Sequence, residues 1–162
     1  MSEYGVLAEI SAWTSSAYMN GILLSGIIYL CNVNWAIMRD EAVRDLKTLQ
    51  NLCGPSALQN VLLTTTQWSK ANPLDGRSRE ETLRARCGWG ELVTQGAAIE
   101  RFLGTRESGL KLIHKLMKNE PKPLLIQHQI VNEAKALEET DAGKEMVSSF
   151  PHWRNLRKTR SA

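Results

Sequence analysis

Apolar residues recur along this chain with two different spacings, one helical and one typical of buried strands. A helical spacing predicts an amphipathic helix over residues 6–18, which ends at the C-cap pair Asn20-Gly21. The apolar side of that helix comprises Val6, Leu7, Ile10, Trp13 and Ala17. The continuous apolar run that follows, 22–31, is rich in β-branched residues and leucine and predicts a buried parallel strand.

The two spacings alternate along the rest of the chain. Further strands are predicted over 60–66 and 97–103, and further helices over 40–53, 110–117 and 124–139. Another helix is predicted to begin at Ser78, which would be its N-cap and would form a capping box with Glu81. After Gly143 the periodicity disappears, which indicates a mobile tail. Strands that alternate with helices predict βαβ units, and therefore an α/β fold with a parallel sheet covered on both faces.

The run 22–31 has a second interpretation, as the start of a membrane span that reaches Met38. Asn20, Ser25, Asn32 and Asn34 interrupt that window, and no uniform stretch of the ~20 apolar residues that a span needs is present. We therefore expect no transmembrane span.

Composition places the chain among soluble globular proteins. Its 162 residues are 43% hydrophobic and 23% charged, which excludes wholesale disorder. Three cysteines without a signal-peptide pattern predict reduced thiols and a cytoplasmic location. Cys31, Cys53 and Cys87 share no ligand spacing with each other or with the histidines, so neither a metal site nor a cysteine nucleophile is expected.

The net charge of +3 belongs to the C-terminal segment and not to the body of the chain. Without its four cations the remaining sequence is slightly acidic, so no domain-wide positive field favours nucleic acid. The cations and the aromatic residue beside them are Trp153, Arg154, Arg157, Lys158 and Arg160. Two interpretations stay open for this segment: a solvated tail, or a contact with an anionic membrane surface.

Three segments, in order and spacing, carry a resemblance to a known family. They are 24–30, 60–70 and 104–108. Over residues 2–145 the chain resembles the second half of a family of fungal G-domain proteins, which are P-loop GTPase-like and distantly similar to septins and to the immunity-associated (AIG-type) GTPases. The Thr-Thr-x-Trp element at 65–68 is the most distinctive part of the resemblance.

The resemblance implies a partial P-loop NTPase-like, Rossmann-like fold in three layers, with a short parallel sheet of about three strands. Residues 1–118 would be the distal half of a G-domain-like unit, 119–145 a C-terminal helical extension and 146–162 the basic tail. The loop that reads guanine would hold Thr65, Thr66, Trp68, Ser69 and Lys70, and the loop that backs the base would hold Gly104, Thr105, Arg106, Glu107 and Ser108.

Two parts of that implied site have a structural alternative. Trp68 either stacks near a nucleotide or covers the end of the sheet, and covering is favoured because tryptophan usually buries most of its area. The run 106–108 either shapes a base pocket or is an ordinary helix N-terminus with an acid in its first turn.

The departures from the family pattern concern the phosphate chemistry. A P-loop needs Gly-x-x-x-x-Gly-Lys-Ser/Thr, and the one Gly-Lys pair, Gly143-Lys144, is followed by glutamate and lacks the upstream glycine. No Asp-x-x-Gly switch element occurs either. Because phosphoryl transfer depends on positioning by these motifs, we expect no GTP hydrolysis by this chain. GTP and Mg²⁺ are cofactors of the family by resemblance only, and no cofactor is expected for this chain alone.

Ser69 takes the place of the family's guanine-reading aspartate. Hydrogen bonds to a charged group contribute about 1.5–3 kcal/mol, against about 0.5–1.5 kcal/mol for neutral ones. Guanine preference is therefore expected to fall by an order of magnitude or more.

Two hypotheses follow. The first is a partial G domain from a truncated gene model, which cannot bind or turn over GTP by itself. The second is a genuine short interaction protein, not an enzyme. It would self-associate or bind a protein partner through the edge of the strand at 22–31, because the P-loop strand that pairs there in the complete fold is missing.

Overall fold

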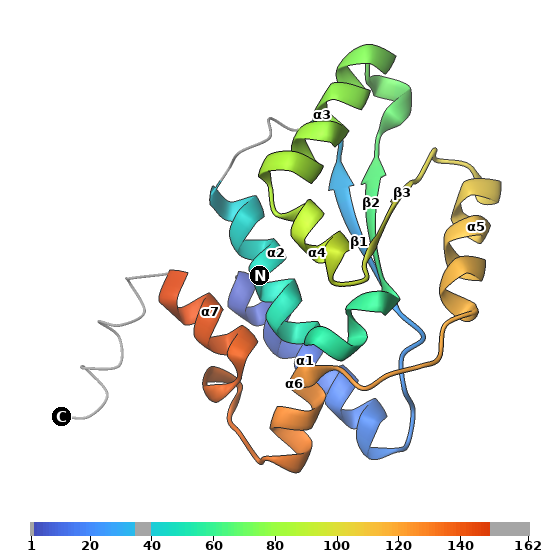
Figure 1. Cartoon of the computed structure of the whole chain (residues 1–162). Helices are drawn as coiled ribbons and strands as arrows, with labels where there is room; N and C mark the ends of the chain where they lie inside the picture. The colour runs from blue at the N-terminus through green and yellow to red at the C-terminus, as the bar shows by residue number, and fades with distance from the viewer. Residues whose placement is uncertain (1, 35–39, 150–162) are drawn as a thin grey trace.

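The computed structural model describes residues 2–34 and 40–149, and its centre is a parallel sheet (Figure 1). The strands are β1 (Ile27–Asn32), β2 (Val61–Thr66) and β3 (Ala98–Arg101), in the order β1-β2-β3. Ile27 of β1 lies opposite Val61, and Leu62 of β2 lies opposite Ala98. Each strand overlaps a predicted one, so the prediction of an α/β fold with a short parallel sheet is confirmed.

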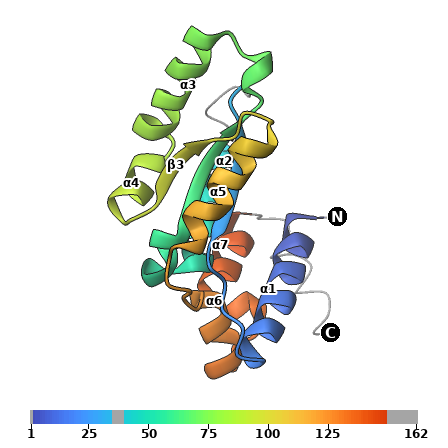
Figure 2. The same ribbon diagram turned by 90° about the vertical axis from the view of Figure 1, so that its right-hand side faces the viewer.

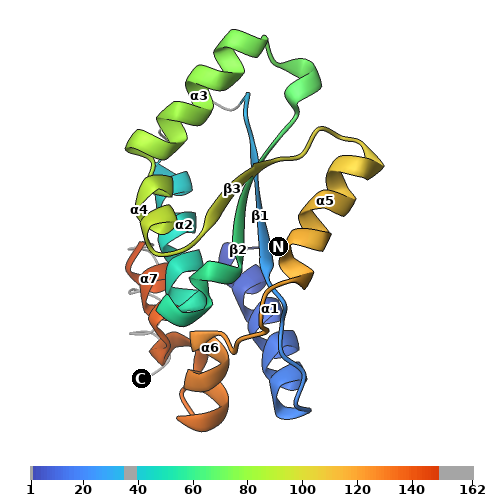
Figure 3. The ribbon, with the colours of Figure 1, turned by 45° about the vertical axis from the view of Figure 1, so that its right-hand side comes forward.

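Helices cover both faces of this sheet (Figures 2 and 3). Helices α2, α3 and α4 lie on one face, α5 lies on the other, and α1, α6 and α7 gather near the amino ends of the strands. The bounds are α1 Glu3–Met19, α2 Asp40–Cys53, α3 Pro73–Arg86, α4 Trp89–Thr94, α5 Arg106–Met117, α6 Leu125–Gln127 and α7 Asp141–Ser149. Shorter 3-10 turns span Pro55–Asn60, Trp68–Lys70 and Leu137–Glu139, and a π turn spans His128–Asn132.

Alternate residues of β2 supply the two cores. Val61 and Leu63 belong to the large core with α2, α3 and α4, whereas Leu62 packs with Leu112 and Leu116 of α5. Because β2 is the central strand and both its faces are covered, its sequence is continuously apolar at the start, without polar alternation.

Helix α1 presents its faces the other way round from the prediction. Its buried residues are Leu7, Ser11, Thr14 and Ser15, whereas Val6, Ile10 and Trp13 are exposed. Burial of the hydroxyl face is possible because Ser11 and Thr14 donate hydrogen bonds to carbonyls of their own helix, at 2.6 and 2.7 Å. These small side chains face α6, where Gln127 Nε2 donates to the carbonyl oxygen of Thr14 at 2.9 Å. The predicted helix is present, but of the residues on its apolar side only Leu7 is buried in the core.

The predicted start of a helix at Ser78 is also wrong, because α3 begins at Pro73. Asn72 is the N-cap, and its side chain accepts a hydrogen bond from the amide of Leu74 at 3.0 Å. Proline has no backbone N–H, but at the first helical position that N–H would have no partner within the helix, so its loss costs no hydrogen bond. Ser78 and Glu81 therefore lie inside α3.

The helix predicted over 124–139 is interrupted. It consists of α6 and the π turn, after which Ala134 takes a left-handed conformation with φ of 54°. Two buried glutamines fix this path, because Gln127 Oε1 accepts from the amide of Leu124 at 2.7 Å and Gln129 Oε1 accepts from the amide of Asp141 at 3.0 Å.

Helix α7 stands where the loss of periodicity predicted a mobile tail. Its Ala142 and Met146 join the large core, and α7 packs along α2. The prediction of a tail directly after Gly143 is therefore wrong for residues up to Ser149. The basic segment with Trp153, Arg154, Arg157, Lys158 and Arg160, for which a solvated tail and a membrane contact both stay open, lies outside the described residues. Within 2–34 and 40–149 no helix combines the length and the apolar character needed to cross a bilayer.

Candidate binding site at the carboxyl ends of the strands

A cavity of about 290 Å³ opens where the parallel strands end. This volume is at the lower limit of the ~300–1,000 Å³ typical of small-molecule pockets. The carboxyl ends of parallel strands are also where α/β proteins bind their ligands. The lining comes from β1, from the loop after β2 and from the loop after β3, and comprises Leu30, Thr66, Gln67, Trp68, Ser69, Phe102, Leu103 and Gly104.

The structure therefore brings the two predicted loops together. Thr66, Trp68 and Ser69 from the first loop and Gly104 from the second all line this cavity. Thr65 is buried beneath Trp68, and its hydroxyl accepts a hydrogen bond from the indole Nε1 at 3.1 Å. Lys70 is exposed outside the lining.

A polar network of Arg101, Glu80 and Thr65 supports the Trp68 side chain. The Arg101 guanidinium lies over its ring, 4.1 Å from the centroid, and forms a salt bridge with Glu80 of α3. The hydroxyl of Thr65 donates to Glu80 Oε1 at 3.0 Å. The hydrogen bonds that Arg101 donates to Glu80 raise the pKa of Arg101, so the guanidinium over the ring stays cationic.

Helix α3 approaches Trp68 closely at Gly76. A Cβ atom on Gly76 would lie 2.8 Å from Cζ3 of Trp68, closer than real Cβ contacts allow. The indole thus fills the space between the end of β2 and α3, which supports the packing interpretation of Trp68. One part of the residue still reaches the cavity.

Gln67 gives the loop its shape through a strained backbone. Its φ of 64° is left-handed, which costs a non-glycine residue roughly 1–2 kcal/mol. Its carbonyl accepts a hydrogen bond from Asn34 Nδ2 at 3.0 Å, and Asn34 Oδ1 accepts from Arg79 of α3 at 3.2 Å. These contacts join the segment after β1, the loop after β2 and α3 around one rim of the cavity.

Residues 104–108 begin α5. Thr105 is the N-cap, with its hydroxyl accepting from the amide of Ser108 at 3.2 Å and the Ser108 hydroxyl accepting from the amide of Thr105 at 3.3 Å. Arg106 and Glu107 are exposed and outside the cavity lining. This geometry supports the interpretation of 106–108 as an ordinary helix N-terminus. Among residues 104–108, Gly104 alone lines the cavity.

Two larger hollows run along β3 and α5, and charged side chains that pair with each other line them. Glu100 forms ion pairs with Lys111 and Lys115 of α5, and Glu80 pairs with Arg101. These pairs link strand β3 to its neighbouring helices. No group of three or more His, Cys, Asp or Glu side chains that could hold a metal ion is found in the part of the chain that the structure describes.

Sequence patterns did not reveal the network behind Trp68. Glu80 and Arg101 are distant from Trp68 in sequence, and neither lies in a motif. The Trp68 N–H donates to the nearby Thr65 hydroxyl, and Glu80 reaches that hydroxyl and Arg101 only because α3 folds over the end of β2. The strained Gln67 also gave no signal, because its position does not carry the glycine that usually marks such a conformation.

Comparison of the chain with family models, with curated proteins and with solved structures returns no match. The fold and the cavity define an α/β protein with a three-stranded parallel sheet and a small cavity at the carboxyl edge of that sheet.

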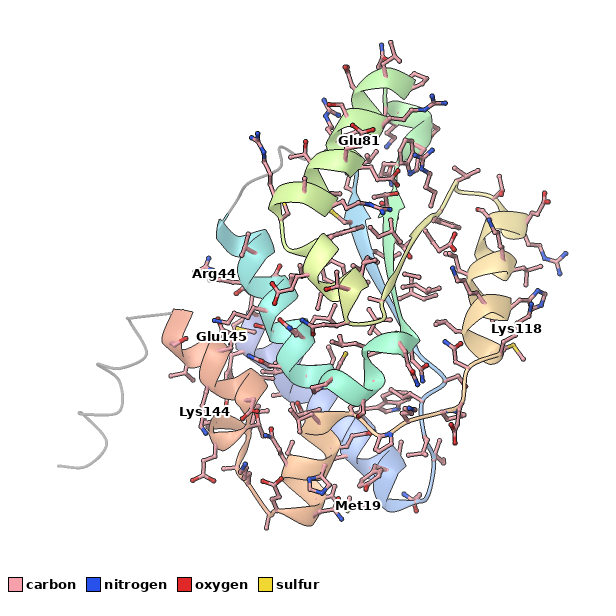
Figure 4. All side chains as sticks on the ribbon, in the orientation of Figure 1. Met19, Arg44, Glu81, Lys118, Lys144 and Glu145 are labelled. Carbon is pink, nitrogen blue, oxygen red and sulfur yellow. The ribbon has the colours of Figure 1, made fainter. Side chains whose placement is uncertain are left out.

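Glu80→Gln is expected to lower the free energy of unfolding by about 1–2 kcal/mol, because it replaces charge-assisted hydrogen bonds to Arg101 with neutral ones in a partly exposed pair. Glu81→Gln is the matched control, since Glu81 is the exposed neighbour on the same helix (Figure 4). Urea denaturation followed by tryptophan fluorescence measures both variants. Equal midpoints for the two would contradict a supporting role of Glu80.

Proposed function

We propose that this protein is the distal half of a P-loop NTPase-like G domain. We propose that it binds the base of a nucleotide weakly and does not hydrolyse GTP. One observation carries the proposal. The two loops that the family resemblance pairs around a base lie at the ends of adjacent parallel strands and line one cavity.

The position of the Gly-Lys pair supports the non-enzymatic part. Gly143 is buried in the first turn of α7, where its amide donates to the Thr140 hydroxyl at 3.0 Å. Lys144 lies near the opposite end of the molecule from the cavity (Figure 4). A lysine there cannot reach a phosphate whose base is bound at the carboxyl ends of the strands.

The base loop supports weak and unselective recognition. Ser69 is exposed and offers a single hydroxyl where the family's aspartate accepts two hydrogen bonds from guanine. Leu30, Phe102 and Leu103 supply apolar surface that accepts either purine. We therefore propose similar, weak affinities for the bases of GTP and ATP.

The test of the non-enzymatic claim is phosphate release from GTP in the presence of Mg²⁺. We expect the same rate as in buffer alone. Mg²⁺-dependent release above that rate, abolished by a substitution in the cavity such as Trp68→Ala, would overturn the proposal.

We propose a second candidate function, binding of a protein strand through β1, because the two edges of the sheet differ. β3 is short, and charged pairs flank it: Glu100 with Lys115, and Arg101 with Glu80. Such charges are a usual protection of edge strands. β1 is longer, with the sequence IIYLCN, and carries no charge. Its edge therefore favours addition of another strand.

A further inference from the structure

The hydrogen-bonding direction of each β1 residue follows from one contact. The Val33 amide donates to the carbonyl of Thr66 in β2 at 3.1 Å. Backbone groups alternate in direction along a strand, so Tyr29 and Cys31 also face β2. The amides and carbonyls of Ile28, Leu30 and Asn32 consequently point away from β2, toward an edge where no other described strand pairs.

Exposed apolar residues lie on β1 and on the helix beyond this edge. The Leu30 side chain is 60% exposed, on the face of the sheet that α5 covers in part. Helix α1 lies beyond β1 on the side away from β3 (Figure 2), and it carries the exposed stripe of Val6, Ile10 and Trp13, with Trp13 65% exposed. Met19, at the end of α1 (Figure 4), and Ile22 in the following loop are exposed as well.

The stretch of sequence that contains β1 carries no charge. Residues 10–38 contain no Asp, Glu, Lys, Arg or His. A two-fold contact brings a surface patch against its own copy, so a charge near the axis would meet a like charge. β1 itself is free of that repulsion, which favours pairing of this strand with its own copy.

We propose that the free edge of β1 pairs with β1 of a second copy, in antiparallel orientation about a two-fold axis, to give one continuous six-stranded sheet. This inference rests on the second candidate function and names its partner. A two-fold axis at Leu30 pairs Ile28 with Asn32 of the second copy, so each outward residue exchanges hydrogen bonds.

The α1 stripe completes the contact. A strand pair alone buries less than the ~1,200 Å² of the smallest stable interfaces. Helix α1 projects beyond β1 on the side where the second copy joins, so its apolar stripe adds to the area that the dimer buries.

The experiment is light scattering and sedimentation of the full chain over micromolar to submillimolar concentrations. We expect a mass near twice 18.2 kDa that falls to the monomer mass on dilution. Leu30→Lys places a charge opposite its own copy, and we expect the monomer mass at every concentration. The matched control is Leu74→Lys, at a leucine that is 74% exposed on α3, and it is expected to keep the wild-type dimer.

Circular dichroism and thermal unfolding establish that the Leu30→Lys variant is folded. Hydrogen exchange supplies an independent measurement, with the amides of Ile28, Leu30 and Asn32 protected at high concentration and exchanging fast on dilution.

Three outcomes overturn the inference in different ways. A dimer that survives Leu30→Lys places the contact elsewhere. A wild-type monomer whose β1 amides exchange fast rejects the second copy and leaves the edge open to a foreign strand. A monomer whose β1 amides are protected rejects the binding function of the edge itself.

Discussion

Replacing Gly143 with alanine is expected to destabilise the protein by about 3 kcal/mol, because an added methyl group has no room there. A Cβ atom at Gly143 would lie 1.9 Å from the carbonyl oxygen of Leu137 and 3.0 Å from the Thr140 hydroxyl. That hydroxyl donates to the Leu137 carbonyl at 2.7 Å and accepts from the Gly143 amide. Relief of the clash has to open the buried turn that docks α7 on α2.

Gly109→Ala provides the matched control for that substitution. Gly109 lies inside α5, and its nearest neighbour to an added Cβ atom would be Cε2 of Phe102 at 3.5 Å, an ordinary contact. This variant is expected to gain up to about 1 kcal/mol from higher helix propensity. Denaturant unfolding measures both variants. If Gly143→Ala is as stable as the wild-type protein, α7 does not belong to the core.

Deprotonation of the buried Cys53 thiol at alkaline pH is expected to lower the free energy of unfolding by about 4 kcal/mol. Cys53 ends α2 with no exposed area, and burial raises the pKa of its thiol from 9.0 to about 12. The folded state therefore holds this proton more tightly than the unfolded state. The contribution is complete below pH 9 and is lost as pH rises toward 12, at about 1.36 kcal/mol for each unit of pKa difference.

Cys53→Ala tests this origin of the alkaline sensitivity. Its stability between pH 9 and 10 is expected to fall less with pH than that of the wild-type protein, and the remaining fall comes from Cys31 and Cys87, whose thiol pKa burial also raises. Burial also raises the pKa of Tyr29, from 10.0 to about 12, so Tyr29→Phe is expected to change the pH dependence only above pH 10. Urea denaturation at a series of pH values distinguishes the two. Parallel pH profiles for wild type and Cys53→Ala would contradict the assignment.

The parts of the fold that local pattern determines could be predicted. β2 is an apolar run because helices bury both its faces, and α2 has a clear amphipathic spacing and an end at Gly54, whose φ is 71°. The cavity could also be predicted in outline, because parallel strands bring the segments that follow them to one edge of the sheet.

The parts of the fold that depend on tertiary contacts could not be predicted from the sequence. Helix α1 has apolar residues on two sides, and only the close approach of α6 decides that Ser11 and Thr14 face inward. The break at Ala134 follows from partners of buried glutamines that no local pattern shows. At the site, Trp68 was predicted, but its support by Glu80 and Arg101 depends on α3 folding over the end of β2.

We propose that the loops after β2 and β3 are the base-side loops of a G domain, and that the protein lacks the means to hold a triphosphate. The most direct test is titration of the full chain with a fluorescent GTP analogue, once with Mg²⁺ and once with a chelator. We expect no saturable Mg²⁺-dependent binding. Any weak signal should be the same under both conditions and competed equally by GTP and ATP. Saturable binding that requires Mg²⁺ and prefers GTP would contradict it.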